Sequence, residues 1–102
     1  MTVNELKTLL DAKQRYSLLD VREPWEFEFC HIDGSRNVPM SELPKQIGTL
    51  DKDEEFVVIC HHGMRSLQVT YYLKNAGIEK VHNLDGGIAA WSATIDPDMP
   101  QY

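Results

Sequence analysis

Cysteine is scarce in this sequence, with two residues among 102, Cys30 and Cys60. Two cysteines are too few for the disulfide scaffold of a small secreted domain, and in a reducing compartment a cysteine is more often catalytic, metal-bound or buried. Each one is followed by histidine, His31 and His61. Three interpretations are therefore open: a split metal site, a disulfide, or one reactive cysteine and one bystander.

Long apolar runs and basic clusters are also lacking. No stretch approaches the roughly 18 to 20 apolar residues of a transmembrane helix, and the first residues carry no signal-peptide pattern, so we expect a cytoplasmic protein without a membrane partner. A net charge of -6 argues against a nucleic-acid partner, which would require a basic face. The length of 102 residues and an apolar fraction of 42% are typical of one folded domain, residues 1–102.

Apolar spacing and capping residues predict alternating strands and helices. The expected helices are 2–13, 24–29, 41–47, 64–75 and 88–91, and the expected strands are 17–21, 36–39, 56–60 and 80–84. The strand 56–60 begins with four consecutive bulky apolar residues and shows no alternation. Such a run indicates burial on both faces, as in the centre of a covered parallel sheet. The sequence therefore predicts a three-layer α/β fold, with a central, mainly parallel sheet flanked by helices.

One strand-to-helix turn combines the features of an anion site. In open α/β sheets ligands bind beyond the carboxyl ends of the strands, where this chain places Asp20 and Arg22 after one strand and Cys60 after another. Cys60 is the only strong nucleophile among them, and the loop His61-His62-Gly63-Met64-Arg65 leads directly from it into a helix. The amides of such a loop and the helix N-terminus converge on an anion, which favours the reactive thiolate form of Cys60.

Four motifs resemble those of the single-domain rhodaneses in order and separation, and together they cover nearly the whole chain. They are Asp20-Val21-Arg22-Glu23-Pro24, His31-Ile32-Asp33-Gly34-Ser35-Arg36-Asn37-Val38-Pro39, Cys60-His61-His62-Gly63-Met64-Arg65-Ser66 and Leu84-Asp85-Gly86-Gly87-Ile88-Ala89-Ala90-Trp91. The resemblance implies a rhodanese-like fold and a sulfurtransferase. In that family the cysteine matching Cys60 carries a persulfide, and the amides of the loop, here residues 61 to 65, hold the outer sulfur.

The same resemblance implies the reactants. The donor would be a small anion such as thiosulfate or a protein persulfide, and the acceptor would be cyanide or a thiol. No metal or organic cofactor is required. Arg65, His61 and His62 are expected to attract the anionic donor into an otherwise acidic protein. For the two histidines an equal alternative stays open, in which both side chains face solvent and only their backbone serves the loop.

Two other activities remain as alternatives. Phosphatases with this fold place five residues between cysteine and arginine, whereas four separate Cys60 from Arg65, and Ser66 stands at the arginine position. The shorter loop suits a sulfur atom, so phosphatase or arsenate reductase activity is less favoured. A regulatory or protein-binding module without activity usually lacks the cysteine, which is present here. A metal site is not expected, because neither Cys-His pair has the ligand spacing of structural zinc.

The roles of three further residues stay open. Asp20 and Arg22 are expected beside the site, but Arg22 and Glu26 at i and i+4 would also brace the short helix as an ion pair, and we favour a structural role. Cys30 stands where the family usually has glycine, so a strained backbone is possible there. We expect Cys30 to be a buried thiol. The alternative, a disulfide with Cys60, requires Cα atoms within about 7 Å. The oligomeric state is not predicted.

Overall fold

Four parallel strands form the centre of the molecule, in the order β2-β1-β3-β4. The computed structural model describes residues 1–102. The strands are β1 (Ser17–Asp20), β2 (Arg36–Asn37), β3 (Phe56–Ile59) and β4 (Val81–Asn83). The helices are α1 (Val3–Asp11), α2 (Pro24–Phe29), α3 (Leu43–Gln46), α4 (Met64–Asn75) and α5 (Gly87–Thr94), and 3-10 turns at Met40–Glu42 and Ile47–Thr49 flank α3. The predicted α/β class and its parallel sheet are confirmed.

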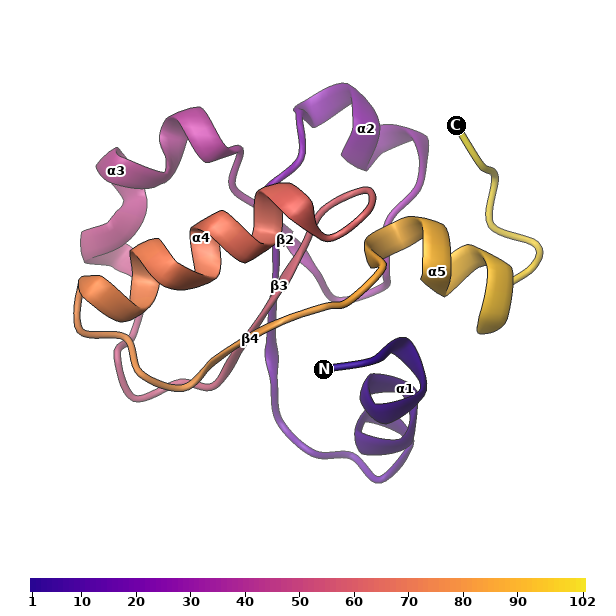
Figure 1. Cartoon of the computed structure of the whole chain (residues 1–102), viewed down its shortest axis with the longest axis horizontal. Helices are drawn as coiled ribbons and strands as arrows, with labels where there is room; N and C mark the ends of the chain where they lie inside the picture. The colour runs from indigo at the N-terminus through magenta and orange to yellow at the C-terminus, as the bar shows by residue number, and fades with distance from the viewer.

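Strand β3 separates two hydrophobic cores. Its residues alternate between them, with Phe56 and Val58 in the core beneath α3 and α4, and Val57 and Ile59 in the core beneath α1 and α5. None of the four is more than 3% exposed. The unbroken apolar run in the sequence is thus explained, because both faces of this strand are covered. Figure 1 shows α3 and α4 on one side of the sheet and α1 and α5 on the other, which gives the expected three layers.

Local capping chemistry fixes several of these boundaries. Thr2 and Glu5 form the reciprocal capping box expected at the start of α1, and Pro24 occupies the first turn of α2. One expectation was wrong: the helix expected over 41–47 does not begin at 41, because the chain first makes a 3-10 turn, Met40–Glu42, whose N-cap is Pro39. No helix of the structure has the length and apolar character needed to cross a membrane.

Candidate active site

Cys60 immediately follows β3 and is 1% exposed. Its side chain belongs to the core on the α4 side of the sheet. The backbone N–H of Gly63 donates a hydrogen bond to Cys60 Sγ at 3.0 Å. Gly63 is also the N-cap of α4 and has φ +98°, a left-handed conformation that a residue with a Cβ rarely adopts. The loop therefore turns back on its own cysteine within three residues.

The start of α5 orients the first peptides of this loop. The N–H groups of Ile88 and Ala89 donate to the carbonyl oxygens of Cys60 and His61, at 2.9 and 3.0 Å. In a trans peptide the N–H points opposite to the preceding C=O. The N–H groups of His61 and His62 therefore point away from α5 and towards the inside of the loop.

Further amide donors converge on the same place. The N–H groups of His61, His62, Met64, Arg65 and Ser66 have no hydrogen-bond partner among the backbone carbonyls. The last three belong to the first turn of α4, a helix of 12 residues whose positive dipole end faces the loop. These N–H groups and the Gly63 N–H are the donors that an anion at Cys60 would require.

The guanidinium of Arg65 is held by a carboxylate of α2. Arg65 Nη1 and Nη2 donate to Glu26 Oε1 and Oε2 at 2.8 and 2.9 Å, and the Tyr102 hydroxyl donates to Glu26 Oε2 at 2.7 Å. These hydrogen bonds raise the pKa of Arg65 above its ordinary value, against the effect of burial. Arg65, which we expected to attract an anionic donor, thus has its charge balanced by Glu26.

The two histidines form part of an aromatic stack. His61 lies between His62 and Tyr102, with ring centroids 4.1 and 4.0 Å apart. Burial, and then the neighbouring His62, lower the pKa of His61, which disfavours its charged form. The expected attraction of an anion by a charged His61 is not supported. The unpartnered backbone amides are the donors that the loop offers to an anion.

Asp20 and Arg22 form a fully buried ion pair beneath the loop. Arg22 Nε and Nη2 donate to the two carboxylate oxygens of Asp20 at 2.9 and 2.7 Å, and both side chains are 0% exposed. The other guanidinium protons reach the carbonyl oxygens of Glu26 and Cys30 and the hydroxyl of Tyr102, at 3.3, 2.6 and 2.8 Å. All five donors of Arg22 are thus satisfied.

This network corrects one interpretation of the sequence. Arg22 contacts the backbone of Glu26, while the Glu26 carboxylate pairs with Arg65, so the expected ion pair at i and i+4 was wrong. Burial acts to lower the pKa of Arg22, but hydrogen bonds to Asp20 and Tyr102 outweigh it and raise that pKa. Arg22 closes the carboxyl end of α2 and ties it to β1.

The comparisons with known proteins agree with this geometry. The model of the family described as "Rhodanese-like domain" matches residues 2–94. The chain belongs to the rhodanese-like domain family.

Relatives of similar length carry sulfurtransferase names. Thiosulfate sulfurtransferase GlpE of Shewanella oneidensis is 37% identical over 91 residues, which are 89% of this rhodanese and 89% of GlpE. The rhodanese-related protein of Thermoplasma volcanium superposes with a TM-score of 0.82 at 35% identity, over 98% of this chain and 93% of that one. Human single-domain sulfurtransferase TSTD1 gives 0.85 at 27% identity, over 92% and 95%. These likenesses support an enzyme of the rhodanese type.

Larger proteins contain a similar domain. The chain spans 26% of the length of two Mycobacterium tuberculosis relatives to which it is 36% identical over 104 residues. The same domain therefore also occurs as a part of longer chains.

Cys30 of this rhodanese is buried, as predicted, but it lies on the other side of the sheet from Cys60. It is 7% exposed and belongs to the core beneath α1 and α5, whereas Cys60 belongs to the opposite core. Both cysteines are free. Cys30 has φ -163°, ordinary extended backbone, so the expected strain is not found. Its backbone carbonyl accepts a hydrogen bond from Arg22 and so helps to satisfy the buried guanidinium.

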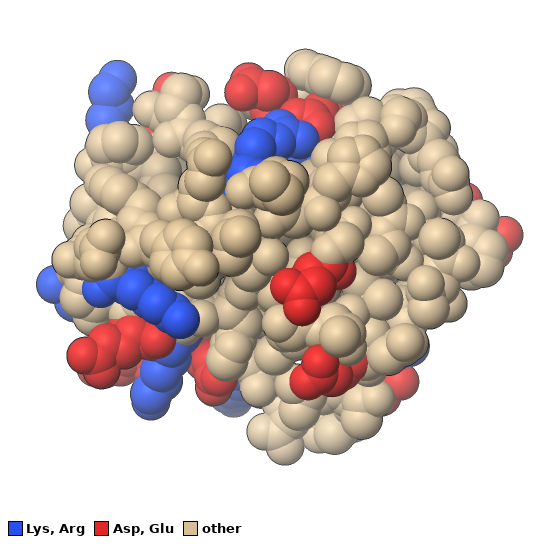
Figure 2. Space-filling view, viewed as in Figure 1, with Lys and Arg blue, Asp and Glu red and all other residues tan.

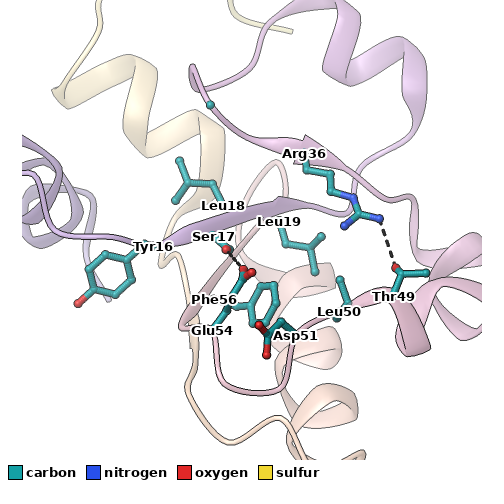
Figure 3. A pocket seen from close by; sticks show the side chains of 11 residues that line it. Tyr16, Ser17, Leu18, Leu19, Arg36, Thr49, Leu50, Asp51, Glu54 and Phe56 are labelled. Carbon is teal, nitrogen blue, oxygen red and sulfur yellow. Dashed lines mark hydrogen bonds between the residues drawn. The ribbon is translucent and has the colours of Figure 1, made fainter.

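One cavity of the rhodanese lies at the end of the sheet opposite to Cys60. A cavity of about 300 Å³ opens at the amino ends of β1 and β3, between Ser17, Phe56 and Arg36. Figure 3 shows Arg36 reaching Thr49 there, and the hydrogen bond between Ser17 and Glu54 across the mouth. This end of the sheet is opposite to Cys60. No three His, Cys, Asp or Glu side chains are close enough together to hold a metal ion.

The Glu26–Arg65 pair gives the rhodanese a pH-dependent stabilisation. Hydrogen bonds from Arg65, opposed by burial and supported by Tyr102, lower the pKa of Glu26 from 4.5 to about 2. A carboxylate whose pKa falls on folding stabilises the protein above its unfolded pKa, and this stabilisation is lost as the pH drops from about 4.5 towards 2. We expect Glu26→Gln to lower the free energy of unfolding near neutral pH by about 2 kcal/mol, measured by urea titration.

The control is the same pair of proteins at low pH. The difference between wild type and Glu26→Gln should shrink steadily below about pH 4.5, because the wild-type carboxyl then takes up its proton on unfolding. A difference that stays constant down to about pH 3 would contradict the ion pair as its source.

Proposed function

We propose that this rhodanese is a cytoplasmic sulfurtransferase, one domain over residues 1–102, that carries sulfur as a persulfide on Cys60. The observation that supports this most directly is the set of amide donors around Cys60 Sγ, one of which, the Gly63 N–H, already donates to it. A persulfide extends the thiol by one sulfur atom and keeps a negative charge. The free amides at the start of α4 suit that charge.

The reaction has two balanced steps. The Cys60 thiolate attacks the sulfane sulfur of thiosulfate, the bond between the two thiosulfate sulfurs breaks with its electron pair, and sulfite leaves. Cyanide or an acceptor thiolate then attacks the outer sulfur of the persulfide. The S–S bond breaks towards Sγ, and the Cys60 thiolate is restored. His61, His62, Gly63, Met64 and Arg65 serve the reaction through their backbone, while Asp20 and Arg22 hold the strand and helix beneath it.

The surface around the loop also fits a protein as sulfur donor. Large apolar side chains lie exposed there: Trp25 and Phe29 on α2 pack edge-on against Tyr102, and Met64, Leu67 and Tyr71 share one face of α4. Figure 2 shows uncharged surface over much of the face bearing α4 and α5, interrupted near its middle by acidic side chains. A protein persulfide docked on this area would place its sulfur at the mouth of the loop.

The test of the proposal is sulfur transfer by wild type and Cys60→Ser. We expect thiosulfate to add one sulfur atom to the wild type, seen by mass spectrometry of the intact protein, and cyanide to remove it as thiocyanate. Cys60→Ser should show neither, whereas Cys30→Ser should keep both, because Cys30 lies in the opposite core. Full transfer by Cys60→Ser would refute the assignment. Hydrolysis of an aryl phosphate without sulfur transfer would favour the phosphatase alternative, and inactivity of the wild type would favour a regulatory module.

A further inference from the structure

Ser66 brings a side-chain hydroxyl to the active-site sulfur. Ser66 Oγ lies 3.3 Å from Cys60 Sγ and also makes a short hydrogen bond with Asn83 Oδ1 at the end of β4. Ser66 is 0% exposed. A hydroxyl has one proton to donate, so at any moment it serves either the sulfur or the amide oxygen.

Asp85 decides which end of the Asn83 amide faces Ser66. Asn83 Nδ2 donates to Asp85 Oδ1 at 3.3 Å. An ionised carboxylate only accepts hydrogen bonds, so Asp85 holds the amide nitrogen on its own side and turns Oδ1 towards Ser66. With Oδ1 there, the Ser66 proton goes to Asn83 while Cys60 is a neutral thiol, and the thiol proton is free to go to Ser66 Oγ.

We propose that Ser66 is the hydroxyl donor that stabilises the Cys60 thiolate, and that Asn83 is a positioning residue that competes for the same proton. When Cys60 becomes an anion, the O–H of Ser66 rotates from Asn83 Oδ1 to Sγ, without movement of any heavier atom. A hydrogen bond to a charged acceptor is stronger than one to a neutral amide. The half-buried Asn83 oxygen is then left for solvent.

This exchange serves a particular moment of the proposed reaction. When an acceptor takes the outer sulfur, the electron pair of the S–S bond moves to Cys60 Sγ, which leaves as a thiolate. Ser66 Oγ lies 3.3 Å from that sulfur, and rotation of its O–H is enough to bring the proton to Sγ. Ser66 should therefore accelerate discharge of the persulfide. This part of the inference rests on the proposed function, whereas the stabilisation of the free thiolate does not.

The first measurement is the rate at which iodoacetamide alkylates Cys60 as a function of pH. Its midpoint is the pH at which the rate is half of its maximum. A Cys30→Ser background ensures that only Cys60 is followed. We expect Ser66→Ala to raise this midpoint by about one pH unit, because a charge-assisted hydrogen bond is lost. Asn83→Leu, which keeps the volume and removes the competing acceptor, should lower it by about half a unit. The double variant should match Ser66→Ala, since Asn83 acts only through Ser66.

Opposite shifts distinguish this competition from a merely structural role, which would move both variants the same way. The charged and titratable groups around the site are Asp20, Arg22, Glu26, His61, His62, Arg65, Asp85 and Tyr102, and none of them is substituted in these variants. Thr70→Val is the matched control. It removes another buried hydroxyl of α4, which donates to the Ser66 carbonyl and not to sulfur, and it should leave the midpoint unchanged.

The second measurement is single-turnover discharge of the loaded protein by cyanide. Ser66→Ala should slow it about tenfold, and Ser66→Thr should restore much of the rate. Equal shifts of the alkylation midpoint in Ser66→Ala and Asn83→Leu, or none in either, would overturn the inference. If neither the wild type nor any variant takes up sulfur, the proposed function fails. The alkylation result still decides the role of Ser66.

Discussion

Asp20→Ala should lower the free energy of unfolding by about 3 to 5 kcal/mol, measured by urea titration near neutral pH. The change leaves the guanidinium of Arg22 buried, charged and without its carboxylate, in a place where both side chains are 0% exposed. Removing one partner of a buried pair costs far more than the pair contributes, because the remaining charge has no solvent. Two of the five Arg22 donors would also lose their acceptors.

The double variant Asp20→Leu with Arg22→Met tests that reasoning. It removes both charges, so it should be more stable than Asp20→Ala, although the carbonyls of Glu26 and Cys30 then lose a donor. A loss below about 1 kcal/mol for Asp20→Ala would contradict the picture of an ion pair closed off from water.

Gly87→Ala should disrupt the active-site loop from outside it. A Cβ on Gly87 would stand 2.3 Å from the Cys60 carbonyl oxygen and 2.6 Å from that of His61. Gly87 also has φ +58°, where a side chain adds strain. The neighbouring Ile88 and Ala89 amides bind those same carbonyls, so the backbone has no room to yield without breaking these hydrogen bonds. We expect a loss of about 2 to 4 kcal/mol in unfolding free energy and about 100-fold in sulfur transfer.

Gly34→Ala is the matched control for that substitution. Gly34 has φ +85°, but a Cβ there would meet nothing within 4 Å. It should therefore cost only the backbone strain, about 1 kcal/mol, and leave sulfur transfer within about twofold of wild type, since Gly34 lies outside the loop. Equal effects of the two substitutions on thiocyanate formation would show that the close approach at Gly87 is not what shapes the loop.

Local patterns were enough to predict the order of the elements. The apolar run at 56–59 has one physical explanation, burial on both faces, and Pro24 and the Thr2–Glu5 box mark helix starts by their own chemistry. The position of Cys60 between that strand and a glycine-containing loop likewise predicted the tight turn into α4. These inferences succeeded because strand, turn and helix are contiguous in the chain.

Partners across the fold were not predictable in the same way. Arg65 meets Glu26, 39 positions away, and Arg22 meets Tyr102, 80 positions away. The i and i+4 spacing suggested Arg22 with Glu26 instead. Spacing indicates only partners that are close in the sequence, whereas the contact between Glu26 and Arg65 joins α2 to α4. In the sequence Ser66 stands at the place of a phosphatase arginine and gives no sign of a contact with Cys60. Its contact with Asn83 depends on β4, and the Gly86-Gly87 pair gave a turn signal with no indication of its target.

The contact between α5 and the loop also sets an order for folding. Residues 88 and 89 hold the carbonyls of residues 60 and 61, so the sulfur site is assembled by a segment synthesised well after the cysteine itself. Until that last helix docks, the peptides of the loop are free to rotate and the thiol behaves as an ordinary one. The enhanced reactivity of the Cys60 thiol would thus appear late in refolding, and it would report that α5 has docked.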